Sequence, residues 1–461
     1  MFIKKLLHCK GFLKEEVLMM SNFFSPSPGK TKPLAVRGQG IYLYDENGKQ
    51  YIDGSSGAMT VNLGHCNPEI TEKIKNQLNV LTFTYRSQFT NEPLEELCKK
   101  IADFSPGDLN HVSLVNSGSE ATEMGMKLAA SYWNVMGKPG KKRILSGWCS
   151  YHGSTIGALS MTGNPGRRRE YQEYLSDYPV LESAYCHRCP YEKKYPGCGL
   201  FCAQYLEKII TRFGSETISA LILEPVIGAS GAGITPPDGY FEKIRGICSR
   251  NNILLILDEV ITGFGRTGKN FAMEHWNVVP DILVFGKGVS CGYGAVAGIN
   301  ASSLIYDAFV ESKAEFSTGH TFSGNPLAAA GSNAVLDYLI EHQVVEQAEK
   351  MGKYFLEKLN ELQKNSMLVD DIRGKGLLWG VEIVRDKNTH QFFPVENQIS
   401  AKLVSICFEN GLLVYPSAGF IDGKWGDSIL LSPPLVITRE ETNQLFDILE
   451  KSLQILEKQV L

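Results

Sequence analysis

Short apolar runs alternate with helical patterns between about residues 75 and 325. The runs that predict strands are Val112–Val115, Arg143–Leu145, Ala220–Leu223, Leu254–Leu257 and Ile282–Phe285. Strands that alternate with helices predict a mostly parallel sheet covered by helices on both faces, that is, an α/β fold. Ligands of such sheets bind at the carboxyl ends of the strands, so candidate functional residues are expected there.

The pattern changes on both sides of this region. Apolar runs at 41–44 and 49–52 flank Asn47-Gly48, a strong signal for a hairpin turn. After Asn325-Pro326, one long helix is predicted to about Leu362. The elements predicted beyond it are strands at Leu377–Ile383, Leu412–Tyr415 and Ile429–Leu431, a helix from Ile399 that ends at Asn410-Gly411, and a last helix that opens with the capping box Thr438-x-x-Glu441.

These elements predict two domains. The length of 461 residues points the same way, because it exceeds the length of chain that usually folds around a single hydrophobic core. Residues 76–330 are expected to form the large domain. Residues 35–75 and 331–461 are expected to form a smaller α+β domain from the N- and C-terminal segments. Residues 1–34 are predicted to be a poorly defined N-terminal extension.

The composition is typical of a globular protein in water, with 21% charged and 43% hydrophobic residues. A net charge of −4 without a long basic run argues against nucleic-acid binding. No stretch approaches the roughly 20 apolar residues of a membrane span. Residues 1–19 contain lysines and glutamates but no cleavage site of small residues, so neither a secretory signal nor a transit peptide is predicted. A loose helix and a natural start at Met20 both remain open.

Eleven cysteines in a large chain indicate reduced thiols and a cytoplasmic location. Four of them are clustered as Cys186-x-x-Cys189 and Cys198-x-x-x-Cys202, a spacing compatible with a structural zinc site. Only the first pair has the tight spacing of zinc ribbons, and the segment is rich in Pro, Gly and Tyr. We therefore favour an ordered surface excursion and predict no metal site.

Lys287 and Asp258 are the strongest catalytic candidates. Each follows the end of its own buried strand, Ile282–Phe285 and Leu254–Leu257. A lysine and an aspartate placed in this way suit pyridoxal phosphate (PLP), because the amine forms a Schiff base with the aldehyde and the carboxylate keeps the pyridine nitrogen protonated.

Other strand ends and loops carry weaker signals. Gly118-Ser119 opens a helix, whose N-terminus favours a phosphate, although Ser117-x-x-Glu120 also fits a plain capping box. Tyr151 can stack on a flat ring with His152 beside it, although core packing explains such a pair equally well. Thr321, in a polar glycine-rich loop, is a candidate phosphate donor.

Arg373 precedes a strand of the smaller domain. Arginine binds a carboxylate through two parallel hydrogen bonds, so Arg373 is a candidate anchor for an amino or oxo acid. A surface ion pair is the alternative.

Over residues 35–455 the chain resembles the class III PLP-dependent aminotransferases of fold type I. The resemblance rests on Leu257-Asp-Glu-Val-Ile-Thr-Gly-Phe-Gly-Arg-Thr-Gly268 and Phe285-Gly-Lys287. The motifs Asn116-Ser-Gly-Ser-Glu-Ala121, Tyr151-His-Gly153, Glu224-Pro225 and His320-Thr-Phe-Ser-Gly-Asn-Pro326 follow the family's order.

The resemblance implies that Lys287 binds the cofactor covalently and that Asp258 pairs with its ring nitrogen. It implies that Val260 and Tyr151 lie on opposite faces of the ring and that Gly118 and Ser119 hold the phosphate, with His152 and Glu224 nearby. It also implies a homodimer with shared active sites, in which Thr321 reaches the partner's phosphate. Phe89, Ser56 and Tyr415 are expected to line the substrate pocket.

Two positions distinguish the chain from the 4-aminobutyrate and ornithine branch of this family. That branch carries a glutamine where Ile261 stands here and a glutamate where Ala229 stands, and the glutamate neutralises the carboxylate-binding arginine. The chain is more similar to the ω-amino acid or amine:pyruvate branch and to the diaminopelargonate synthases. Those enzymes carry an arginine near Val414-Tyr415-Pro416, where this chain has Tyr415.

The resemblance therefore implies amino transfer from an amine or ω-amino acid to a 2-oxo acid such as pyruvate. An amino-acid epimerase or a dialkylglycine-type decarboxylase would use the same cofactor residues. A non-catalytic binding module and a nucleotide-binding Rossmann protein fit less well, because Lys287 and Asp258 are both present and no G-x-G-x-x-G motif follows the first strand of the large domain.

Overall fold

The structure is a computed structural model that describes residues 22–25, 27, 29 and 32–461. The predictions for residues 1–19 lie outside the described residues. The helices that the following paragraphs do not discuss are α2 (Ser56–Met59), α6 (Ile156–Met161) and α10 (Ser303–Ser312). Among the helices of the described ranges, none is long and apolar enough to cross a membrane.

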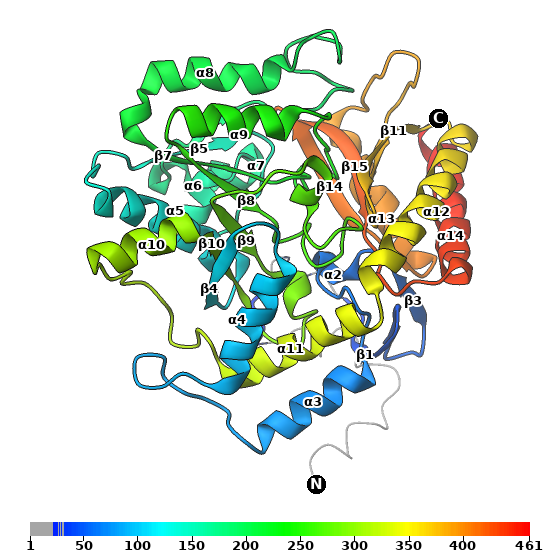
Figure 1. Ribbon diagram of the computed structural model, residues 1–461. Helices are drawn as coiled ribbons and strands as arrows, with labels where there is room; N and C mark the ends of the chain where they lie inside the picture. The colour runs from blue at the N-terminus through cyan, green and yellow to red at the C-terminus, as the bar shows by residue number, and fades with distance from the viewer. Residues whose placement is uncertain (1–21, 26, 28, 30–31) are drawn as a thin grey trace.

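The largest sheet of the described residues has seven strands. Its order is β4 (Leu109–Val115), β10 (Ala297–Ser302), β9 (Ile282–Phe285), β8 (Leu254–Asp258), β7 (Ile218–Leu223), β5 (Arg143–Gly147) and β6 (Pro179–Leu181). Figure 1 shows β7, β8, β9 and β10 among the helices that surround them. Neighbouring strands from β9 to β6 are parallel, whereas β10 runs antiparallel to both β4 and β9. The predicted α/β fold with a mostly parallel sheet is confirmed.

Successive residues of the buried strands face two different hydrophobic cores. Ile222 and Ile256 pack with α5 (Gly118–Val135) in one core. Leu221 and Leu255 pack in the other with α8 (Phe201–Phe213) and α9 (Tyr240–Arg250). This two-residue alternation explains the uninterrupted apolar runs, since both faces of the sheet are covered.

The N-terminal hairpin pairs with a strand from far along the chain. β2 (Tyr42–Asp45) and β3 (Gln50–Asp53) are antiparallel, and Gly48 adopts the left-handed φ of +80° that their turn requires. β1 (Ala35–Gln39) lies beside β2, and the two-residue strand β13 (Leu412–Leu413) pairs parallel with β3. The hairpin prediction is confirmed.

A third sheet has the order β11 (Val369–Lys375), β12 (Leu378–Ile383), β15 (Trp425–Leu431) and β14 (Tyr415–Ile421), all antiparallel. Figure 1 shows it beside α12 (Val344–Asn365), α13 (Ile399–Glu409) and α14 (Arg439–Val460). The Thr438–Glu441 capping box at the start of α14 is present. The limits proposed for the two domains remain a prediction.

The single helix predicted from residue 326 to about 362 is wrong. The chain forms α11 (Pro326–Glu341) and then α12, with Gln343 between them at a left-handed φ of +50°. The break lets each helix pack on a different part of the molecule: α11 lies against α3 (Pro68–Leu78) and α4 (Glu92–Phe104), and α12 lies against β11.

Arg266 connects the N-terminal segment with two segments near the C-terminus through hydrogen bonds. Its fully buried guanidinium donates to the carbonyl oxygens of Leu377 (3.0 Å) and Pro433 (2.6 Å) and to side-chain oxygens of Ser56 (3.2 Å) and Asn62 (2.7 Å). These acceptors come from three segments that are distant in sequence. Burial, which disfavours the charged guanidinium, lowers the pKa of Arg266 to about 10.

We expect Arg266→Met to lower the free energy of unfolding by about 3 kcal/mol, because it leaves several buried acceptors without a donor. Urea unfolding followed by fluorescence measures this change. The control is Arg250→Met, which removes an exposed ion pair with Glu207 and is expected to cost less than about 1 kcal/mol. Equal losses in the two variants would contradict this role of Arg266.

Candidate active site

The predicted site residues lie where five strands of the large sheet end. Gly118 and Ser119 follow β4, Tyr151 and His152 follow β5, and Glu224 follows β7. Asp258 ends β8, and Lys287 follows β9. The strand order places β7, β8 and β9 side by side, so the two carboxylates and the amine belong to neighbouring strands.

Lys287 begins a single 3₁₀ turn, Lys287–Val289, at a left-handed φ of +43°. For a lysine this backbone is unusual and strained, which is common at functional sites. Burial lowers the pKa of the Lys287 amine to about 8, although the charges of Asp258 and Glu224 act in the opposite direction. The amine is therefore closer to its nucleophilic neutral form at neutral pH than an ordinary lysine.

Asp258 is buried and pairs with a histidine. Its Oδ2 lies 2.8 Å from His152 Nδ1, and its Oδ1 accepts from the backbone N–H of Val260 at 3.1 Å. His152 Nε2 is buried and has no hydrogen-bond partner in the described chain. The histidine thus fixes the orientation of the carboxylate from one side.

Glu224 connects the strand ends. Its Oε2 accepts from the N–H of Tyr151 at 2.9 Å, and its Oε1 accepts from the N–H of Gly228 at 3.2 Å. Burial raises the pKa of Glu224 to about 7. Because the Glu224 carboxyl group accepts a hydrogen bond from the Tyr151 N–H, it fixes the position of the Tyr151 backbone.

The start of α5 can hold an anion. Ser117 caps the helix by accepting from Glu120 N–H at 3.3 Å, whereas the N–H groups of Gly118 and Ser119 have no acceptor in the described chain. Ser119 Oγ accepts from the N–H of Ser154 at 3.0 Å, which brings in the loop after β5. Free N–H groups at a helix N-terminus suit a phosphate.

Val260 lies close to the glycines of two of these loops. A Cβ atom on Gly118 would lie 3.1 Å from Val260 Cγ1, and one on Gly286 would lie 3.4 Å from it. Glycine at both positions lets the start of α5 and the Lys287 turn approach Val260 closely. The surroundings therefore fit a flat, phosphorylated ligand that reacts with an amine.

The family model for aminotransferase class-III matches residues 24–453. The chain belongs to the class-III aminotransferases. It is 41% identical over 440 residues to an uncharacterized aminotransferase, YodT, of Bacillus subtilis, covering 95% of this chain and 99% of YodT. It is 32% identical to the putrescine–pyruvate aminotransferase of Pseudomonas aeruginosa, covering 91% of this chain and 90% of that enzyme.

The aminotransferase is also similar to a solved structure of an (S)-enantioselective omega-transaminase from Thermomicrobium roseum. The TM-score is 0.89 at 34% identity, and the match covers 96% of this chain and 97% of that one. PLP is the cofactor of this family, and the protein is a PLP-dependent transaminase. The residues predicted to bind PLP fit it chemically: an amine, a carboxylate and free N–H groups.

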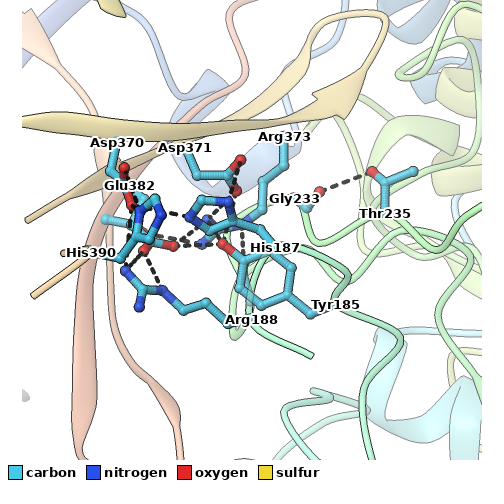
Figure 2. A network of polar contacts seen from close by, with 12 residues as sticks. Tyr185, His187, Arg188, Gly233, Thr235, Asp370, Asp371, Arg373, Glu382 and His390 are labelled. Carbon is cyan, nitrogen blue, oxygen red and sulfur yellow. Dashed lines mark hydrogen bonds and ion pairs between the residues drawn. The ribbon is translucent and has the colours of Figure 1, made fainter. Parts of the chain in front are cut away.

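Arg373 lies in a dense polar network, shown in Figure 2. Its Nη1 donates to Tyr185 Oη (2.7 Å) and forms ion pairs with Glu382 (2.7 Å) and Asp371 (3.1 Å). Its other nitrogens donate to Gly231 O and Ser428 Oγ, both at 3.2 Å. Arg373 is only 7% exposed, so the predicted substrate carboxylate would have to displace partners that the chain itself supplies.

The two positions that set the chain apart from the 4-aminobutyrate branch are buried. Ile261 packs on the backbone of the Glu224–Gly231 loop: a Cβ atom on Gly228 would lie 2.5 Å from Ile261 Cδ1. Ala229 carries no charge, and the acids that pair with Arg373 are Glu382 and Asp371. The arginine is therefore neutralised from its own sheet.

The remaining predicted pocket residues are placed differently. Ser56 is buried, donates to Ser432 O at 2.7 Å and accepts from Arg266. Tyr415 is partly buried at the start of β14. Phe89 and Thr321 are exposed, and neither is hydrogen-bonded to the five strand ends within the described chain. Their roles remain predictions.

The ten cysteines of the described ranges are all free. Cys186, Cys189, Cys198 and Cys202 line one small cavity of about 20 Å³. Among the described residues, the group of three potential metal ligands whose atoms all lie within 4.8 Å is a different one, namely His187, Asp370 and His390. His187 and His390 both contact Asp370 Oδ2, at 3.0 and 2.8 Å, and these distances are those of ordinary hydrogen bonds.

One residue near the site was missed by the sequence interpretation. The guanidinium carbon of Arg167, in α7 (Pro165–Arg168), lies 4.5 Å from the centre of the Tyr151 ring. The signal in the sequence was the run of three arginines Arg167-Arg168-Arg169. Only the short helix α6 separates this run from Tyr151.

Proposed function

We propose that this transaminase moves an amino group from an amine or ω-amino acid to a 2-oxo acid such as pyruvate. The observation that carries the proposal is the pairing of Arg373 with Glu382 and Asp371. A neutralised arginine favours donors without a carboxylate next to the reacting amine. The names of its relatives, a putrescine–pyruvate aminotransferase and an omega-transaminase, point the same way.

The roles proposed for the chain's own residues follow from their positions. Bound PLP supplies an electron-accepting ring for the substrate carbon. Asp258 holds a proton at the ring nitrogen, and His152 keeps Asp258 oriented. Lys287 Nζ, once free, accepts and returns the proton at the substrate carbon that carries the amino group. Gly118 and Ser119 bind the phosphate through their N–H groups, and Tyr151 and Val260 confine the ring.

A panel of amine donors, each assayed against pyruvate and 2-oxoglutarate, tests the proposal. The expected result is conversion of amines or ω-amino acids that requires a 2-oxo acid. Turnover of a single amino acid without any 2-oxo acid would indicate an epimerase, and release of carbon dioxide would indicate a decarboxylase. Either outcome would overturn the proposal.

We propose further that the protein is a cytoplasmic homodimer with shared active sites. Large apolar side chains are exposed on the segments around residues 83–89 and 322, including Phe89 (68% exposed) and Phe322 (61% exposed). The ring centres of Phe83 and Phe322 lie 5.9 Å apart, so the two segments meet in one apolar surface. Such a surface supports a subunit interface beside Thr321. Free thiols support a reducing compartment.

The pKa of Lys287 predicts how PLP uptake depends on pH. Attack on the aldehyde requires the neutral amine, whose fraction rises with pH through the pKa of about 8. The rate constant for covalent capture of PLP by the apoprotein is therefore expected to rise with pH, to be half-maximal near pH 8 and to level off about one pH unit above that. Stopped-flow absorbance measures it. A rate constant that keeps rising to pH 10 would show that Lys287 has an ordinary pKa.

A further inference from the structure

Arg167 is a cation beside Tyr151 that has no acidic partner among the described residues. Among the described residues, its guanidinium forms no ion pair and no hydrogen bond, and its one recorded side-chain contact is with the Tyr151 ring. The backbone N–H of Tyr151 donates to Glu224, and the next residue is His152, which pairs with Asp258. The positive charge of Arg167 is also close enough to lower the pKa of Lys287, after the larger effects of burial and of Arg266.

The turn that carries Arg167 is fixed in place. Asn164 caps it by accepting from the N–H of Arg167 at 3.2 Å. The next residue, Arg168, is buried and donates to the carbonyl oxygens of Leu159, Ser160 and Thr162 at 2.8–3.1 Å. Arg168 thus anchors the turn, and Arg167, which is exposed, keeps its donors free.

Arg373 and Arg167 differ in what they can still bind. All three nitrogens of Arg373 have acceptors within the chain, whereas none of those of Arg167 has one in the described residues. A 2-oxo acid carries its carboxylate on the carbon next to the reacting carbonyl, so the group that binds it must be close to Lys287. A free guanidinium binds a carboxylate with two parallel hydrogen bonds.

We propose that Arg167 is the substrate-binding residue that receives the carboxylate of the 2-oxo acid acceptor. The inference rests on the proposed function and adds the residue that selects the acceptor. The face of the Tyr151 ring supports the Arg167 guanidinium. Arg373 has a structural role in the third sheet. The amine donor, which needs no carboxylate, makes no use of Arg167.

The test compares two acceptors in the holoenzyme with one saturating amine donor. Pyruvate carries a carboxylate, and butanal does not. Arg167→Gln is expected to raise the KM for pyruvate about 10- to 100-fold, the size expected for a lost charge-assisted hydrogen-bond pair, and to leave the KM for butanal within about 3-fold. Arg167→Lys is expected to recover part of the pyruvate affinity.

Arg169→Gln is the matched control, since Arg169 is exposed on the adjoining turn, and it should change neither KM. Titration of the holoenzyme with propionate, followed through the cofactor absorbance, gives the same comparison without turnover. A pyruvate KM that stays within 3-fold in Arg167→Gln overturns the inference, as does an equal rise for both acceptors. Failure of the proposed function is recognised separately, because the wild-type enzyme would then convert no 2-oxo acid.

Discussion

Replacing Lys287 with alanine is expected to lower the transamination rate at least about 10³-fold. The variant loses both the covalent attachment of PLP and the proton transfer at the substrate carbon, and acid–base catalysis alone contributes about 10²- to 10⁴-fold. The backbone supports a specific role, since Lys287 is held at a positive φ in the turn after β9. The measurement is the single-turnover rate with an amine donor.

The matched control is Lys269→Ala, because Lys269 forms an ion pair with Glu349 at 3.4 Å and lies partly exposed. It should retain the wild-type rate and the visible absorbance of bound cofactor. Wild-type turnover by Lys287→Ala would remove the basis for every role that we assign in this site.

Asp258→Asn is expected to retain PLP and to lower kcat about 10²- to 10³-fold, the range found when one preorganised electrostatic group is removed. The amide cannot keep the ring nitrogen protonated, and it also changes the hydrogen bond to His152, which is 2.8 Å from the carboxylate. Cofactor content by absorbance and kcat by steady-state assay are measured on the same preparation.

Asp258→Glu keeps the charge and is expected to recover part of the rate. The assignment of Asp258 fails if the asparagine variant works within 3-fold of wild type. The fall in kcat with full cofactor occupancy separates this role from a merely structural one.

The sequence predicted those parts of the site that depend on strand ends. Lys287 and Asp258 were found because each follows an uninterrupted apolar run, and such runs are buried strands. The strand β10 was not predicted, because Ala297-Gly298 and Asn300-Ala301-Ser302 contain few of the β-branched residues that mark strands. Its burial comes from its neighbours β4 and β9.

The state of Arg373 depends on strand register, which the sequence does not reveal. Arg373 lies opposite Gly380 in the β11–β12 pair, so Glu382, two residues further, is on the same face of the sheet and within reach. The sequence also does not reveal which of Arg167, Arg168 and Arg169 contacts the Tyr151 ring. Which of three successive arginines faces Tyr151 depends on how a short turn packs, and tertiary contacts decide it.

The parallel pairing of β3 with β13 joins segments about 360 residues apart, at Ile52 and Leu412. Lys49 strengthens this junction, because its Nζ donates to the carbonyl oxygens of Phe408 and Glu409. During synthesis on the ribosome, the N-terminal hairpin therefore emerges long before its partner exists. Tyr51 and Ile52, both buried in the finished protein, stay uncovered until almost the whole chain has been translated. The nascent chain thus has a long interval in which chaperones can bind it.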